Sequence, residues 1–300
     1  MPQLNLPSPI EDLDGFSDHY NVSIKREDLI HPDFGGNKWR KLKFNIEKVK
    51  RDNYKCLITF GGPFSNHIVA TARACKYYGI PSIGIIRGDY VDTTNPSLIA
   101  AHASGMKIYH VSKYEYKLKE ESESFKNILT NYSDAWVVPE GGGNNLAVQG
   151  ASETAIEIRE AKTQLDYIII SGGTGTTSAG LINGMNNTSK VVIINTLKNE
   201  SLQEAIAGQL DGEFSNWKVL NDYHQGGFAK TNLALQKFAQ DFYIKYNIKL
   251  DPIYNSKMMY AVHQLCKERF FKMNAKILCI HTGGHQGIDA WNYRMKKDWL

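Results

Sequence analysis

The 300-residue sequence lacks any long apolar run. No stretch approaches the ~20 consecutive apolar residues that a helix needs to cross a bilayer. The first residues, MPQLNLPSPIEDLDGF, show no basic start followed by an apolar segment, which is the pattern of a signal peptide. We therefore expect a cytoplasmic protein that does not bind membranes.

Cysteine is scarce, and the four cysteines form no CxxC pair. They lie mostly in apolar segments, where a free cysteine acts as a small hydrophobic residue. Disulfide frameworks and zinc sites instead need paired or closely spaced cysteines. The sequence therefore predicts neither disulfides nor a zinc site, and we expect no metal. The cysteines are Cys56, Cys75, Cys266 and Cys279.

An excess of charge of one sign is also missing. The 35 basic and 31 acidic residues leave a formal charge of only +4, which gives no sign of a nucleic-acid groove. With 42% apolar residues the chain can bury a large core as one large or two modest domains. No repeat, low-complexity tract or obvious linker divides it. A site for an acidic ligand must therefore be inferred from local motifs rather than from the net charge.

Short apolar runs alternate with helical segments along most of the chain. Runs such as YIIIS and VVIIN do not alternate with polar residues, which favours strands covered on both faces. The segment SNHIVATARACKYYG begins at Ser65, a suitable N-cap, and ends at Gly79, a suitable C-terminal stop. The polar segment from residue 113 to 132 is predicted to form a surface helix. The expected fold class is α/β, with mainly parallel sheets between helices.

Three glycine-rich turns each follow a predicted strand. They span Phe60–His67, Ser171–Gly180 and His281–Gly287. Each alone is explained by a tight turn. In an open parallel sheet, however, ligands bind beyond the carboxyl ends of the strands, where glycines admit them closely. The three turns together therefore indicate one crevice.

The turn at Ser171–Gly180 is the strongest phosphate candidate. Its glycines expose backbone amides and its threonines add hydroxyl donors where a helix begins, so one phosphate could be held without any lysine. A dinucleotide fingerprint would need glycine at Ser178 and an acid where Asn195 stands, which disfavours NAD. No Gly-Lys dipeptide occurs, so a Walker loop is excluded. The residues proposed to hold the phosphate are Gly172, Gly173, Thr174, Gly175, Thr176 and Thr177.

Lys38 follows two glycines and an asparagine at the start of a basic helix. Trp39 and its i+3, i+7 and i+10 neighbours form the apolar stripe of that helix. Lys38 lies nearer the centre of this stripe than Arg40, Lys41 or Lys43. An ammonium in low dielectric at the positive end of a helix loses proton affinity, and a neutral amine can form a Schiff base with an aldehyde. A snorkelling surface lysine is the alternative. An aldehyde-bearing cofactor with one phosphate is pyridoxal phosphate.

The motifs REDL, GGNKWRKL, FSNH, PEGGGN, LDPIYNSKMMY and IHTGG occur in order along nearly the whole chain. Together they resemble the 1-aminocyclopropane-1-carboxylate deaminase and D-cysteine desulfhydrase family. The resemblance implies a tryptophan synthase β-like fold of two three-layer α/β/α domains with pyridoxal phosphate in the cleft. Residues 1–40 and 150–300 would form the large cofactor-binding domain, and 41–149 a small inserted one.

The resemblance also implies roles for single residues. Lys38 would hold the cofactor and act as the base for the α-proton, and Ser65 and Asn66 would meet the substrate carboxylate, although Ser65 is also a plain N-cap. His67 would lie against the cofactor ring and near the substrate, and Tyr254 would be the active-site tyrosine. Thr282 would face the pyridine nitrogen, with Asn255 beside it, and His281 would be structural.

Departures from one branch of the family bear on the substrate. The ring-opening deaminases have glutamate, leucine and tyrosine where this chain has Asn255, Thr282 and Phe228. Neutral groups beside the pyridine nitrogen weaken the electron sink, which favours β-elimination from a small D-amino acid such as D-cysteine, giving pyruvate, ammonia and sulfide. Ring opening of the cyclopropane substrate is the first alternative, and a non-catalytic ligand-binding protein is the second. A homodimer is expected because it is usual among relatives.

Overall fold

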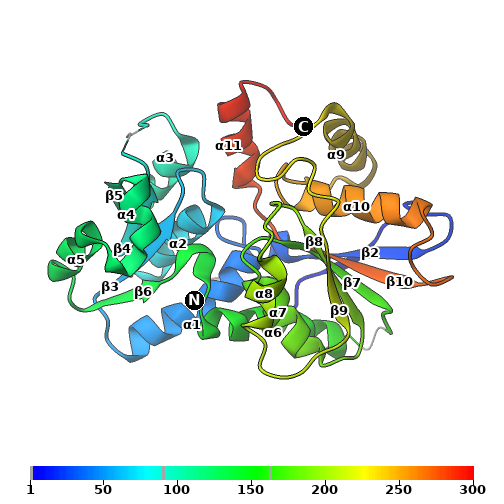
Figure 1. The fold of residues 1–300 in the computed structure, drawn as a ribbon, viewed down its shortest axis with the longest axis horizontal. Helices are drawn as coiled ribbons and strands as arrows, with labels where there is room; N and C mark the ends of the chain where they lie inside the picture. The colour runs from blue at the N-terminus through cyan, green and yellow to red at the C-terminus, as the bar shows by residue number, and fades with distance from the viewer. Residues whose placement is uncertain (1–2, 90–91, 162–163) are drawn as a thin grey trace.

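The computed structural model describes residues 3–89, 92–161 and 164–300, and two sheets organise them (Figure 1). All strand pairs are parallel except β1 with β2. The six-stranded sheet has the order β1 (Ile10–Asp12), β2 (Asn21–Arg26), β10 (Lys276–His281), β7 (Tyr167–Gly172), β8 (Lys190–Asn195) and β9 (Trp217–Leu220). The four-stranded sheet has the order β5 (Lys107–Val111), β4 (Ser82–Arg87), β3 (Cys56–Gly61) and β6 (Ala135–Val138).

Helices connect these strands and cover both sheets. They are α1 (Asn37–Arg51), α2 (Asn66–Tyr78), α3 (Pro96–Ala103), α4 (Lys113–Leu118), α5 (Glu123–Thr130), α6 (Asn145–Glu160), α7 (Thr176–Met185), α8 (Leu202–Ala207), α9 (Leu233–Tyr246), α10 (Asn255–Lys267) and α11 (Gln286–Met295). Three 3₁₀ turns, η1 (Glu27–Leu29), η2 (Lys119–Glu121) and η3 (Glu140–Gly142), complete the described elements. Within these residues, no helix combines the length and the apolar character needed to span a membrane.

The apolar strands β7 and β8 are buried between two helical layers. On one face Ile169 and Val192 pack with residues of α9 and α10. On the other face Ile168 and Ile193 pack with residues of α6, α7 and α8. The predicted α/β class, with mainly parallel sheets covered on both sides, is therefore confirmed.

Helices α1 and α6 connect the two sheets and pack on each other. Leu42 and Ile46 of α1 join Leu57 of β3 in the core of the smaller sheet. The strands of the larger sheet come from residues 10–26 and 167–281, and those of the smaller sheet from 56–138. We propose the division into 1–40 plus 150–300 and 41–149 as the domain organisation, with its boundaries inside α1 and α6.

Local signals set several helix ends. Ser65 has an extended backbone and its hydroxyl accepts the Ile68 amide, while Gly79 has a left-handed conformation, so both predicted ends of α2 are confirmed. The prediction of one surface helix over residues 113–132 was wrong in part. Ser122 is extended and accepts the Phe125 amide, which starts a new helix there. Tyr116, Phe125 and Ile128 are buried against the smaller sheet.

Candidate active site

The three glycine-rich turns meet other loops at the carboxyl ends of β3, β7 and β10. The Asn37 amide donates to the Thr282 carbonyl at 3.0 Å, and the Asn37 side chain donates to Thr177 Oγ1 at 3.0 Å. Gly36 has a φ of 88°, and a Cβ there would lie 2.5 Å from the Thr282 carbonyl oxygen. Only glycine permits this approach. The start of α1 is thus held between the turns that follow β7 and β10.

Lys38 lies at this junction and is half-buried. Its Nζ donates to Asn37 Oδ1 at 3.0 Å. Burial lowers the pKa of Lys38 to about 8, although the negative charge of Asp251 opposes the shift. A substantial fraction of the amine is therefore neutral near that pH, which is what a nucleophile toward an aldehyde requires.

The prediction that Lys38 would point inward more than Arg40 or Lys41 was wrong. Arg40 and Lys41 are only 1% and 3% exposed. Arg40 donates two hydrogen bonds of 2.9 Å to Glu27 and forms an ion pair of 2.7 Å with Glu157. These partners from η1 and α6 neutralise the buried guanidinium and anchor α1, the helix that carries Lys38.

Lys41 is a residue of the site that the sequence reasoning missed. Its Nζ donates to the Gly141 carbonyl at 2.9 Å and lies 3.5 Å from Thr174 Oγ1. Burial, together with the charge of Lys38, lowers the pKa of Lys41 well below its ordinary value. The three-residue spacing from Lys38 places both lysines on one face of α1, which was the available signal. The sequence indicates that this loop could hold one phosphate without any lysine, and the structure places the Lys41 amine next to it.

Replacing Lys41 with methionine is expected to weaken the binding of pyridoxal phosphate by roughly 10- to 100-fold. The estimate follows from losing one charged hydrogen bond to phosphate, worth about 1.5–3 kcal/mol. Equilibrium titration of the apo-protein with the cofactor measures the effect. Lys50→Met is the matched control, since Lys50 is an exposed lysine of the same helix. Equal affinity of the two variants would contradict a role for Lys41 at the phosphate.

The loop after β7 has the donors that one phosphate group needs. Gly175, with a φ of 87°, caps α7, and Thr176 Oγ1 is buried without a hydrogen-bond partner. A Cβ at Gly143 would lie 3.3 Å from that same oxygen, and one at Gly141 would lie 2.9 Å from Thr174 Cγ2. The glycines of PEGGGN thus let η3 pack directly on this loop. The helix N-terminus and the orphaned hydroxyl form a cradle for an anion.

The start of α2 brings two predicted residues, Asn66 and His67, to the same region. The Asn66 side chain lies against Gly284, where a Cβ would stand 2.9 Å from Asn66 Nδ2. The Thr59 hydroxyl donates to the Val138 carbonyl, so His67 Nε2 donates to Thr59 Oγ1 at 2.8 Å. His67 Nδ1 is then an acceptor, and it is buried without a partner. Burial and the charges of Lys38 and Lys41 hold the pKa of His67 well below its ordinary value, so the ring is neutral.

Asp251, which the sequence reasoning did not select, organises the DPIYN turn. Its fully buried carboxylate accepts the amides of Ile253, Tyr254 and Asn255 at 2.9 Å each, and Asn255 Nδ2 at 2.6 Å. Burial and the negative charge of Asp251 raise the pKa of Tyr254. The Tyr254 hydroxyl is therefore a proton donor at neutral pH.

Asn255 connects this turn to the loop after β10. Its Nδ2 also donates to the Gly283 carbonyl at 2.8 Å, and its Oδ1 accepts the Thr282 amide at 3.0 Å and the Thr282 hydroxyl at 3.3 Å. Protein groups thus occupy the amide of Asn255, and its direct effect is to orient Thr282.

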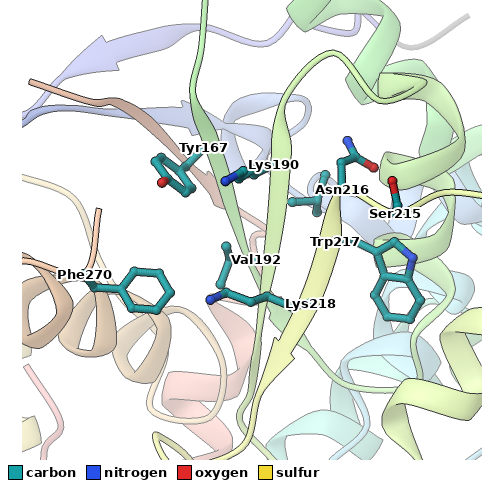
Figure 2. A pocket seen from close by; sticks show the side chains of 9 residues that line it. Tyr167, Lys190, Val192, Ser215, Asn216, Trp217, Lys218 and Phe270 are labelled. Atoms are coloured by element: carbon teal, nitrogen blue, oxygen red, sulfur yellow. The ribbon is translucent and has the colours of Figure 1, made fainter. Parts of the chain in front are cut away.

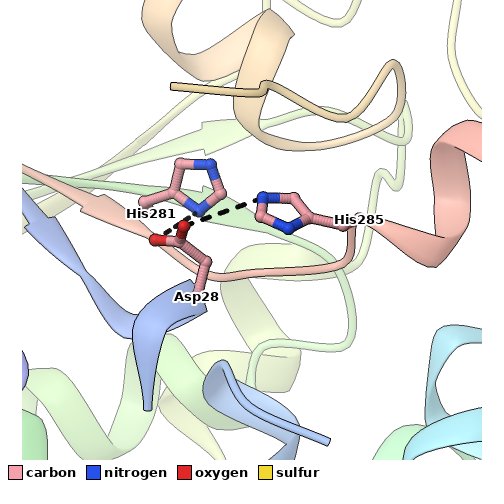
Figure 3. Close-up of side chains that lie close together, drawn as sticks. All are labelled: Asp28, His281 and His285. Atoms are coloured by element: carbon pink, nitrogen blue, oxygen red, sulfur yellow. Dashed lines mark ion pairs between the residues drawn. The ribbon is translucent and has the colours of Figure 1, made fainter. Parts of the chain in front are cut away.

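Figure 3 shows a cluster of Asp28, His281 and His285 beside the crevice. Arg26 donates to both oxygens of Asp28 at 2.9 and 2.8 Å. His281 Nε2 donates to the Lys249 carbonyl at 2.8 Å, and its Nδ1 accepts the Gly283 amide at 3.2 Å. Asp28 and His281 thus already have protein partners and hold η1 against β10, whereas His285 Nε2 is buried without a hydrogen-bond partner.

The hollow in Figure 2 is separate from this site. It has a volume of about 360 Å³ and is lined by Tyr167, Lys190, Trp217, Lys218 and Phe270 among others. Tyr167 and Lys190 begin β7 and β8, so the hollow lies at the amino ends of these strands. The glycine-rich loops lie at the opposite, carboxyl ends.

Comparisons with known proteins agree with this chemistry. The family model described as "Pyridoxal-phosphate dependent enzyme" matches residues 2–283. D-Cysteine desulfhydrases of Salmonella schwarzengrund (strain CVM19633) and Salmonella newport (strain SL254) are each 27% identical over 319 residues, covering 97% of this chain and 96% of the relative. A crystal structure of an ACC deaminase homologue has a TM-score of 0.81 at 25% identity, covering 96% of this chain and 92% of that one.

A hydrogen sulfide-producing enzyme from Fusobacterium nucleatum, with a TM-score of 0.67 at 15% identity, shares the fold, covering 93% of this chain and 96% of that one. The residues of the site fit pyridoxal phosphate. Thr176 offers an unpartnered buried hydroxyl at a helix N-terminus, and Lys38 offers an amine of lowered pKa. The fold and cofactor implied by the resemblance are confirmed, and the chain belongs to the family of pyridoxal-phosphate-dependent enzymes.

Proposed function

We propose that the chain is a pyridoxal-phosphate-dependent lyase that eliminates the β-substituent of a small D-amino acid, with D-cysteine as the preferred substrate. The products would be pyruvate, ammonia and sulfide. The observation that carries the proposal is the Lys38 amine, half-buried at the junction of the glycine-rich turns, with a pKa lowered to about 8. The desulfhydrase relatives support the choice of reaction.

When bound, the cofactor supplies an aldehyde carbon and an electron sink. Lys38 would hold the aldehyde and, once substrate displaces it, take the α-proton as a neutral base. The amide-rich start of α2, with Ser65 and Asn66, would bind the substrate carboxylate. Gly173, Thr174, Gly175, Thr176 and Thr177 would hold the phosphate, together with Lys41.

The remaining roles concern the ring and the leaving group. His67, with its free Nδ1, would lie against the cofactor. Tyr254 would donate a proton to the departing sulfur, since its hydroxyl stays protonated at neutral pH. Asn255 would act on the pyridine nitrogen through Thr282, whose amide and hydroxyl it accepts.

Ring opening of 1-aminocyclopropane-1-carboxylate to 2-oxobutanoate and ammonia is the second candidate. The ACC deaminase homologue with a TM-score of 0.81 favours it. The neutral pair of Asn255 and Thr282 opposes it, because no carboxylate there strengthens the electron sink.

A substrate panel tests the proposal. The holoenzyme would be incubated with D-cysteine, L-cysteine, D-serine and 1-aminocyclopropane-1-carboxylate while pyruvate, sulfide and 2-oxobutanoate are recorded. We expect equal amounts of pyruvate and sulfide from D-cysteine and much less product from the others. Formation of 2-oxobutanoate alone would establish the second candidate. No turnover of any amino acid would instead point to a ligand-binding protein without catalysis.

We also propose a cytoplasmic location and a homodimer. All four cysteines are free and buried, as suits a reducing compartment. Relatives of this family are usually dimers, which is the support for the assembly. Light scattering coupled to size-exclusion chromatography would give twice the chain mass of 33.8 kDa for a homodimer.

A further inference from the structure

Lys257 is a completely buried lysine that the chemistry above does not use. It lies in the first turn of α10, and its Nζ donates to the Thr196 carbonyl at 3.1 Å and to the Gly227 carbonyl at 2.6 Å. Within the described residues, no carboxylate forms an ion pair with it. The ammonium is therefore held by backbone carbonyl oxygens.

This placement is costly. Removing an ammonium from water costs several kcal/mol even after relaxation, and the amino end of a helix repels a positive charge. Burial lowers the pKa of Lys257 to about 8, and Asp251 opposes the shift from a distance. A methionine of similar length would fill the space without this penalty. A specific task for the positive charge explains why the position holds a lysine.

The two carbonyls belong to segments that are far apart in sequence. Thr196 directly follows β8, whereas Gly227 lies in the loop between β9 and α9, drawn in yellow in Figure 1. A Cβ at Gly227 would lie 3.3 Å from Lys198 Cβ, so this loop rests on the residues after Thr196. The ammonium joins the two segments at their contact.

The same segments lie next to the candidate active site. A Cβ at Gly173, in the phosphate loop, would stand 3.2 Å from Tyr254 Cε1 and 3.9 Å from Leu197 Cδ1. Leu197 follows Thr196, and Phe228, which is 49% exposed, follows Gly227. The 222–230 loop, which carries Phe228, therefore rests on the segment whose Leu197 side chain borders the phosphate loop near Tyr254.

We propose that Lys257 is a positioning residue, an internal ammonium that holds the 222–230 loop, and with it Phe228, beside the substrate side of the crevice. The part that concerns substrate rests on the proposed function. The part that concerns the loop does not. Carbonyl oxygens also bind free ammonium and potassium ions, so a small cation can replace the side chain when it is shortened.

The test compares Lys257→Ala, which leaves a space for a cation, with Lys257→Met, which fills it. Hydrogen exchange of peptides covering 222–230 is measured in the holoenzyme with and without ammonium chloride. We expect faster exchange in both variants and restored protection by ammonium in Lys257→Ala only. Lys267→Met, at an exposed position of the same helix, is the control and should exchange like the unchanged protein.

Kinetics give a second readout. We expect KM for the amino-acid substrate to rise about tenfold in Lys257→Ala, with a smaller change in kcat, and to recover in ammonium chloride, as for loss of one charged hydrogen bond. The proposal would be overturned if hydrogen exchange of residues 222–230 were unchanged in both Lys257 variants. It would also be overturned if ammonium chloride rescued Lys257→Ala and Lys257→Met to the same extent.

Two further outcomes are informative. If the enzyme turns over no amino acid, the exchange experiment still decides the role of Lys257, so the two proposals fail separately. If the Lys257 variants do not fold, Phe228→Ala takes their place, because a half-exposed side chain can be truncated without loss of the core. Phe228→Ala is expected to raise KM by a larger factor than it changes kcat. An unchanged KM would then overturn the role of the loop.

Discussion

The Lys38→Ala variant is expected to lose elimination activity by about 10⁴-fold, the upper range for removing a positioned general base. It is also expected to lose the covalent attachment of the cofactor, because no other described lysine combines partial exposure with a lowered pKa at this junction. Initial rates of pyruvate formation and the visible spectrum after dialysis measure the two effects.

Lys50→Ala is the control for this experiment, since it removes an exposed lysine of the same helix. It should retain activity and cofactor. Retention of more than a tenth of the activity by Lys38→Ala would contradict the assignment of the base. If added small amines restored the rate of Lys38→Ala and changed the shape of its pH profile, the assignment of Lys38 as the base would be supported.

The Glu27→Ala variant is expected to be destabilised by about 3–5 kcal/mol, because it leaves the buried Arg40 without its main partner. Glu27 is fully buried and accepts two hydrogen bonds from Arg40, together with those of Ser8 and Thr154. Urea unfolding at neutral pH measures the change in the free energy of unfolding. Glu47→Ala, at an exposed position of α1, should change it little.

The pH dependence of this contribution has a defined sign. Burial alone would raise the pKa of Glu27, but the charge and hydrogen bonds of Arg40 lower it below its ordinary value. The stabilisation is therefore present above the ordinary glutamate pKa of about 4.3 and is lost as the pH falls through the lowered value. The double variant Glu27→Leu/Arg40→Met should be more stable than Glu27→Ala. If Glu27→Ala lowered the free energy of unfolding no more than Glu47→Ala does, the account would be contradicted.

Much of the fold follows from local sequence. The runs at β7 and β8 have no polar alternation because helices cover both faces, as the burial of Ile168 and Ile169 in opposite cores shows. Ser65 and Gly79 act where the local chemistry of helix ends predicts. Such signals depend only on a residue and its near neighbours in the chain.

The missed features depend on partners that are distant in sequence. Arg40 and Lys41 are buried because Glu157 and Gly141 lie 117 and 100 residues away in the chain and meet them only in the folded protein. Helical periodicity contains no information about such partners, so it ranked Lys38 above both. Asp251 was missed for a similar reason. Its carboxylate accepts hydrogen bonds from four amide groups that surround it only in the folded protein, and it belongs to no catalytic sequence motif.

Borohydride reduction of the holoenzyme, followed by tryptic peptide mapping, tests the central claim most directly. Reduction fixes the cofactor on the lysine that holds it and blocks trypsin there. The account predicts a single labelled peptide that spans residues 27–40, with the label on Lys38. A label on Lys41, on Lys257 or on any other lysine, with Lys38 unmodified, would contradict it.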